Sequence, residues 1–205
     1  ISEAECHDSD LWHGHRIFAV DGSKLNLPRE LLALGYGLPT PISYRPQGLA
    51  SCLYRLKSAM PYDFGLYKHK DERLCAIEHL SKLTRGDVVV YDRGYFSYVI
   101  LYRHQEAGVH GIFRLTKNTY EPIRNFWRSD AAEAVVTILP EGQHLKNLEK
   151  KYPAIQFEPI SLRLIKYHIA GEAYCLGTTL LDQSISPQDF QDVYHARWGI
   201  EELYK

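Results

Sequence analysis

The sequence lacks the marks of secreted, membrane-spanning and zinc-binding proteins. Four of its 205 residues are cysteine, and no pair of them has Cys-x-x-Cys spacing, which argues against a zinc site. No apolar run reaches the roughly 18 residues that a membrane helix needs, and the sequence shows no signal peptide. We therefore expect buried thiols, a reducing compartment and a cytoplasmic location. The four cysteines are Cys6, Cys52, Cys75 and Cys175.

The chain also lacks an excess of charge of one sign. It has 24 basic and 25 acidic residues, which is not the balance of a free-standing, non-specific nucleic-acid binder. Any contact with nucleic acid must therefore come from local clusters. Residues 111–128 hold four basic side chains against one acidic side chain, and residues 145–168 hold five against two.

Methionine is nearly absent, since Met60 is the single one and the first residue is Ile1. The last residues continue a helical pattern without a glycine or proline to end it. We expect an internal fragment of a longer protein. With 45% hydrophobic residues, the chain can still build a sizeable core, as one domain or as a domain with an insertion.

Apolar runs typical of strands alternate with helical stripes along the first half of the chain. This order is typical of an α/β sheet with parallel neighbouring strands. Residues 28–48 read as a loop, and a final helix begins at Ser186-Pro187. We predict strands at 16–20, 49–56, 59–67, 87–91 and 110–115, and helices at 71–84 and 97–108. A mostly β segment over 116–179 is predicted to hold strands at 135–139, 155–160, 162–169 and 173–179.

Two aspartates follow apolar strands directly. Asp21 comes after Ile-Phe-Ala-Val and Asp92 after Val-Val-Val-Tyr. In open α/β sheets the functional site lies at the carboxyl ends of the strands, so an acidic residue there is a candidate ligand or catalyst. The alternative is that each aspartate only caps a turn, as Asp-Gly and Asp-Arg-Gly often do.

The closing helix adds a third carboxylate. Tyr194, Arg197 and Glu201 are spaced i, i+3 and i+7, which places them on one helical face, and Lys205 lies one turn further. Alternatively, this is a solvated face with weak charge pairing. Three carboxylates without histidine or cysteine suit Mg²⁺ or Mn²⁺. Two such ions can clamp an in-line phosphoryl displacement, which predicts metal-assisted phosphodiester cleavage or transfer.

These motifs together resemble a known family. The stretches around the three carboxylates and the strand Ile112-Phe-Arg-Leu-Thr-Lys-Asn118 occur in the order found in bacterial insertion-sequence transposases of the DDE type. Within that class the chain resembles the IS-four family, named for a Tyr-x2-Arg-x3-Glu-x6-Lys signature. The final lysine of that signature would fall beyond Lys205. The first two stretches are Phe18-Ala-Val-Asp21-Gly-Ser-Lys-Leu-Asn-Leu-Pro28 and Val90-Tyr-Asp92-Arg-Gly-Tyr-Phe96.

The resemblance implies a catalytic domain over residues 1–205 with a ribonuclease-H-like fold. Such a fold is α/β, with a mixed five-stranded sheet flanked by helices and a β-rich insertion before the final catalytic helix. The core would span about 15–115 and 180–205, and the insertion about 116–179.

The resemblance also implies a site. Asp21, Asp92 and Glu201 would be catalytic and would bind two Mg²⁺ ions, with Mn²⁺ also possible. Side chains that would contact DNA are Tyr194, Arg197, Lys205 and Arg114. In some members a tryptophan of the insertion stacks on a flipped base; Trp127 is the candidate here, and a core tryptophan is the alternative.

The implied activity is cut-and-paste DNA transposition in a bacterial, nucleoid-associated setting. Mg²⁺-dependent strand cleavage would be followed by strand transfer, with a hairpin intermediate and a homodimer assembled on transposon ends and target DNA. One alternative is a ribonuclease-H-like nuclease that hydrolyses without strand transfer. Another is a domesticated relative that binds DNA without chemistry, although retention of all three carboxylates argues against it.

Overall fold

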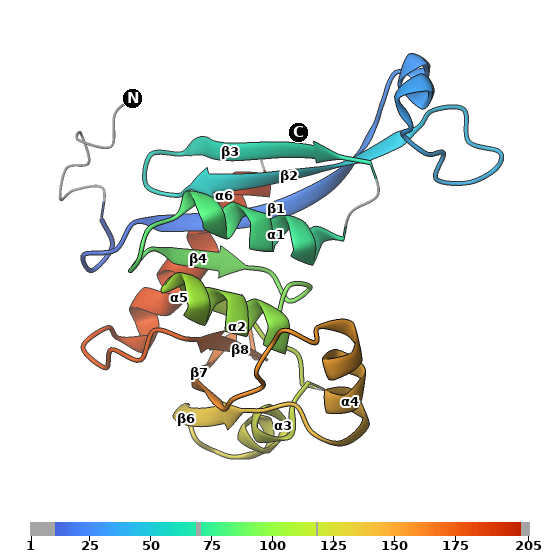
Figure 1. Ribbon diagram of the computed structural model, residues 1–205. Helices are drawn as coiled ribbons and strands as arrows, with labels where there is room; N and C mark the ends of the chain where they lie inside the picture. The colour runs from blue at the N-terminus through green and yellow to red at the C-terminus, as the bar shows by residue number, and fades with distance from the viewer. Residues whose placement is uncertain (1–10, 69–70, 118, 202–205) are drawn as a thin grey trace.

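A computed structural model describes residues 11–68, 71–117 and 119–201, apart from the side chain of Glu201. In this part of the chain, eight strands form one mixed sheet in the order β3-β2-β1-β4-β5-β8-β7-β6 (Figure 1). β1, β4 and β5 are parallel neighbours, and every other pair is antiparallel. The strands are β1 (Ile17–Asn26), β2 (Gln47–Arg55), β3 (Met60–Tyr67), β4 (Val88–Tyr91), β5 (His110–Arg114), β6 (Glu133–Ile138), β7 (Ile160–Ile169) and β8 (Glu172–Thr178).

Helices cover both faces of the sheet, because the central strands are apolar on both sides. Val89 and Tyr91 of β4 belong to a core with α1 and α2, whereas Val88 and Val90 pack with α5 on the opposite face. Asp71, Ser97 and Ser186 cap the first turns of α1, α2 and α5. The helices are η3 (Arg29–Leu34), α1 (Glu72–His79), η4 (Leu80–Lys82), α2 (Tyr98–Ala107), α3 (Glu121–Arg128), α4 (Gly142–Lys151), α5 (Pro187–Ala196) and α6 (Trp198–Glu201).

The α/β sheet predicted from the sequence is confirmed, and the mixed sheet with flanking helices is consistent with a ribonuclease-H-like fold. The buried thiols are also confirmed for Cys52, Cys75 and Cys175, while Cys6 lies outside the described residues. No helix in the described ranges is long and apolar enough to cross a membrane.

The segment 116–179 departs from the sequence prediction in two ways. The strand expected at 155–160 is wrong, since only Ile160 of that range is in a strand, as the first residue of β7. Two helices, α3 and α4, stand beside the β-strands. The strands of this segment also join the main sheet, because β8 pairs with β5. The division into core and insertion stays a prediction.

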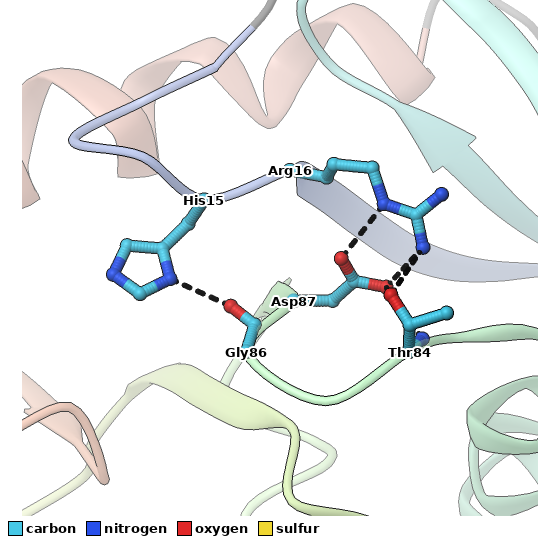
Figure 2. Close-up of polar contacts among 5 residues, drawn as sticks. All are labelled: His15, Arg16, Thr84, Gly86 and Asp87. Carbon is cyan, nitrogen blue, oxygen red and sulfur yellow. Dashed lines mark hydrogen bonds and ion pairs between the residues drawn. The ribbon is translucent and has the colours of Figure 1, made fainter. Parts of the chain in front are cut away.

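A partly buried ion pair closes the end of the sheet at which β4 begins (Figure 2). Arg16 donates from Nε to one carboxylate oxygen of Asp87 at 2.8 Å and from a terminal nitrogen to the other at 2.6 Å. Thr84 donates its backbone N–H to the same carboxylate, and His15 contacts the carbonyl of Gly86. This hydrogen-bonded cluster joins the start of β1 to the start of β4, at the end opposite Asp92.

Protonation of His104 is expected to limit stability in acid. The ring is fully buried, Nδ1 lies 3.0 Å from the carbonyl of Val109, and Nε2 lies 2.9 Å from the hydroxyl of Tyr91. Because a carbonyl only accepts, Nδ1 carries the proton and Nε2 accepts from tyrosine. Burial lowers the pKa of His104 from 6.5 to about 4. As the pH falls below 6.5, His104 of the unfolded chain therefore binds a proton, whereas His104 of the folded chain stays neutral until about pH 4.

We expect the free energy of unfolding to drop by roughly 1.4 kcal/mol per pH unit between pH 6 and pH 4 on account of His104. Urea titrations at pH 7 and pH 5 measure this loss. His110 contributes in the same direction, since burial lowers its pKa as well. The variant His104→Gln removes one titration, so its loss should be smaller. Equal losses in the two proteins would contradict the assignment.

Candidate functional site

Asp21 and Asp92 lie side by side where two parallel strands part. The pairing of β1 with β4 runs from Ile17 opposite Val88 to Val20 opposite Tyr91. Asp21 directly follows Val20 and Asp92 directly follows Tyr91, and neighbouring strands lie about 4.8 Å apart. β4 stops there, whereas β1 continues with β2 as its partner to Asn26. The two aspartates therefore lie at the point where β1 and β4 part.

The expectation that Asp21 ends its strand is wrong. Asp21 lies within β1, opposite Cys52 of β2, so Asp21-Gly22 is not a turn. The antiparallel partner β2 holds this part of β1 extended, which overrides the turn preference of the dipeptide. Asp92 does follow the last residue of its strand, as predicted. Both residues are half-buried.

The side chain of Asp21 faces the side of the sheet that carries α5 and α6. Alternate residues of a strand share a face, and Ala19, two residues earlier, packs with Cys52, Tyr54 and Ile200 of α6. Burial raises the pKa of the Cys52 thiol to about 11, and the negative charges of Asp63 and Asp21 add to this shift. The Asp21 carboxylate is thus close enough to be felt electrostatically at Cys52.

Tyr194 of α5 contacts the second aspartate directly. Its hydroxyl donates a hydrogen bond to Oδ1 of Asp92 at 3.2 Å. Burial raises the pKa of Tyr194 to about 12, the positive charges of Arg197 and Arg114 oppose the shift, and Asp92 adds to it. The phenol therefore stays protonated near neutral pH and acts as a donor that holds the carboxylate in place.

Two arginines flank this hydrogen bond. The guanidinium carbon of Arg197 lies 5.6 Å from the ring centre of Tyr194, and that of Arg114 lies 5.0 Å from the ring centre of Tyr174 on β8. Tyr194 and Arg197 expose only 4% and 5% of their surface, so the solvated-face interpretation is wrong for these two residues. Contact with DNA by Arg114, Tyr194 and Arg197 stays a prediction.

The third carboxylate is placed only through its backbone. α5 and α6 are separated at Arg197, so the single helix expected from the sequence is interrupted there. Buried Ile200 anchors α6 against β1, and Glu201 is the next residue. The side chain of Glu201 and all of Lys205 lie outside the described residues. Among the side chains that are described, no three His, Cys, Asp or Glu residues gather as a metal site.

The donors of this site fit a hard divalent cation. Asp21 and Asp92 offer carboxylate oxygens, which Mg²⁺ and Mn²⁺ prefer, and both lie on the α5/α6 face of the sheet. Glu201 would be a third oxygen donor from α6. Metal binding by these carboxylates and phosphate binding by the nearby arginines stay predictions.

Sequence reasoning missed Tyr174, whose ring positions Arg114. Tyr174 stacks in turn on Tyr167 of β7, with ring centres 5.6 Å apart. No local signal marks this pair among 15 tyrosines. It depends on the pairing of β8 with both β5 and β7, which brings residues far apart in sequence together.

Comparison with known proteins identifies the family. No curated protein matches the chain. Among solved structures, the chain is similar to a piggyBac transposase in a cryo-EM synaptic complex with hairpin DNA, with a TM-score of 0.54 and 12% sequence identity. The likeness covers 92% of this chain and 39% of that one, and at this identity it shows the fold alone. A family model described as transposase DDE domain matches residues 12–205, and with nearly its whole length matched the chain belongs to that family.

Proposed function

We propose that this chain is the catalytic core of a transposase that cleaves DNA strands and transfers them in a Mg²⁺-dependent reaction. The observation that carries the proposal is the position of Asp21 and Asp92 beside each other where β1 and β4 part. α6 packs on the same face, and Glu201 is its last described residue. The four motifs in order further support membership of the IS-four family.

Each residue of the site has a separate part in the proposed mechanism. Asp21, Asp92 and Glu201 would hold two Mg²⁺ ions, which when bound would activate the attacking oxygen and stabilise charge on the phosphate. Tyr194 keeps the Asp92 carboxylate oriented through its hydrogen bond. Arg114 and Arg197 supply positive charge beside it, which attracts the phosphodiester backbone.

The proposed chemistry begins and ends with a displacement at phosphorus. Water attacks a phosphodiester at the end of the transposon, and the 3′-oxygen leaves as a free hydroxyl. That hydroxyl then attacks a phosphodiester of the target, whose own 3′-oxygen leaves. Further proposals follow from the resemblance: a hairpin intermediate, a homodimer on paired DNA ends, and a core of about 15–115 and 180–205 interrupted by the insertion.

A strand-transfer assay separates this function from its nearest rival. The full-length protein is given DNA ends that are already cleaved, together with a supercoiled target and Mg²⁺. We expect joined products with Mg²⁺ or Mn²⁺ and none with EDTA. Metal-dependent nicking without any joined product would favour a ribonuclease-H-like nuclease. Binding without either reaction would favour a domesticated, non-catalytic protein.

A further inference from the structure

A basic hollow of about 600 Å³ lies apart from the aspartates, between α3 and the β7–β8 hairpin. Five of its lining residues carry or can carry positive charge, and Asp130 is the one acidic residue among those that line it in the described part of the chain. The basic residues are Lys117, Arg124, Arg128, Lys166 and His168, and Trp127 contributes an aromatic wall. We call this hollow the α3 pocket.

Two of these cations build the pocket. Lys166 donates from Nζ to the carbonyls of Phe126, Trp127 and Ser129, at 2.9, 3.4 and 2.6 Å. It therefore satisfies the last carbonyls of α3, where the helix dipole is negative. Arg124 donates to the carbonyl of Thr119 at 3.0 Å. Both side chains are engaged with the backbone and fix the shape of the pocket.

Lys117 and Arg128 are not engaged in this way. Both are exposed, and among the described residues neither has a carboxylate partner. Lys117 lies over the ring of Trp127, with Nζ 5.3 Å from the ring centre, which restricts the lysine without neutralising it. The pocket thus presents two cations without an ion-pair partner among the described residues, which a soluble anion or a phosphate of a larger ligand could neutralise.

The α3 pocket lies toward the same ends of the central parallel strands as Asp92. Lys117 follows the end of β5, and β5 runs parallel to β4. Lys166 and His168 lie on the face of the hairpin that carries α3, whereas Tyr174 holds Arg114 on the opposite face. Arg114 and the α3 pocket therefore lie on opposite faces of the sheet, and the β7–β8 hairpin has cations near both of its faces.

We propose that the α3 pocket is a second phosphate-binding site, which holds the DNA backbone away from the bond that is cut. This inference rests on the proposed function, because the DNA strand that reaches Asp92 is the one that would continue past the β7–β8 hairpin. Lys117 and Arg128 would each contact phosphate, while Lys166 and Arg124 keep the pocket in shape. Bases need not enter it, so its contribution to binding is independent of DNA sequence.

Fluorescence anisotropy with a labelled DNA duplex of random sequence tests the proposal. The full-length double variant Lys117→Gln/Arg128→Gln is compared with the wild type over a range of salt concentrations. We expect the slope of log affinity against log salt to fall by about 2, and the affinity near 0.1 M salt to fall at least tenfold or so. The matched control Lys146→Gln/Lys150→Gln removes two exposed lysines of α4 and should leave the slope unchanged.

Thermal unfolding of both variants verifies that they fold, and Lys166 is left intact for this reason. A slope equal to that of the control would overturn the proposal. A second result would also overturn it. Inorganic phosphate would raise the melting temperature of the wild type but not of the double variant, while the two proteins bound DNA equally well. That combination would mark a site for small anions. A wild type that binds no DNA would instead count against the proposed function. A wild type that binds DNA but does not cleave it would count against the proposed function and not against the α3 pocket.

Discussion

Replacing Asp92 with alanine is expected to abolish Mg²⁺-dependent DNA strand cleavage by the full-length protein. The loss should reach the order of 10³-fold or more, since Asp92 would hold a metal ion that supplies several kcal/mol of transition-state stabilisation. Binding to DNA ends should remain, because Arg197, between α5 and α6, and Arg114 of β5 are untouched. Gel analysis of cleaved ends, with a mobility-shift assay alongside, measures both quantities in the same preparation.

The hydrogen bond from Tyr194 offers a graded comparison with Asp92→Ala. Tyr194→Phe keeps the ring that packs against Arg197 and removes only the hydroxyl that orients Asp92. Its loss of cleavage should be far smaller, on the order of tenfold, as expected for one hydrogen bond to a charged group. Cleavage by Asp92→Ala at the wild-type rate would sink the assignment of the metal site.

Replacing Arg16 with methionine should destabilise the fold by about 3–5 kcal/mol, because it strands a buried carboxylate. The Asp87 side chain is only 4% exposed, and Arg16 makes both of its ion-pair hydrogen bonds (Figure 2). The hydrogen bond to Asp87 also raises the pKa of Arg16, so the guanidinium stays charged throughout the accessible pH range. Urea denaturation followed by circular dichroism gives the free energy of unfolding.

Two further variants serve as controls for Arg16→Met. The control Arg85→Met removes an exposed arginine of the same turn and should change stability by no more than about 0.5 kcal/mol. The double variant Arg16→Met/Asp87→Leu removes both charges and should recover most of the loss, because no buried carboxylate is left unpaired. An Arg16→Met protein as stable as the control would refute the importance of the ion pair.

Much of the central sheet could be predicted from the sequence because local patterns and tertiary pairing agree there. The apolar run of β4 and the capped helices α1 and α2 were all expected near their observed bounds. The extension of β1 beyond Asp21 could not be predicted, since the Asp-Gly signal indicates a turn and only pairing with β2 overrides it. The strand predicted at 155–160 was wrong because an apolar pattern alone does not make a strand: no neighbouring strand pairs with the first five residues of that range.

The candidate site was predictable as a set of residue types, but not as an arrangement. Asp92 follows its strand, as the pattern predicts. Tyr194 and Arg197 lie on a shared face, as predicted, because the guanidinium group of Arg197 packs against the ring of Tyr194. The hydrogen bond between Tyr194 and Asp92 joins residues far apart in the chain, so no local spacing announces it. For the same reason the sequence showed two basic stretches but did not show that α3 and β7 bring them together in one pocket.

The continuation of β1 past the end of β4 has a consequence for how this chain can vary in length. Side chains of a strand alternate between the two faces, so one residue lost or gained between Ile17 and Asp21 would turn the carboxylate toward α1 and away from α6. The connection between β1 and β2 has no such constraint, because it follows the aspartate in the chain and its residues 28–45 are exposed or half-buried. Relatives should therefore differ freely in the length of that connection while the first strand keeps a fixed count up to its aspartate.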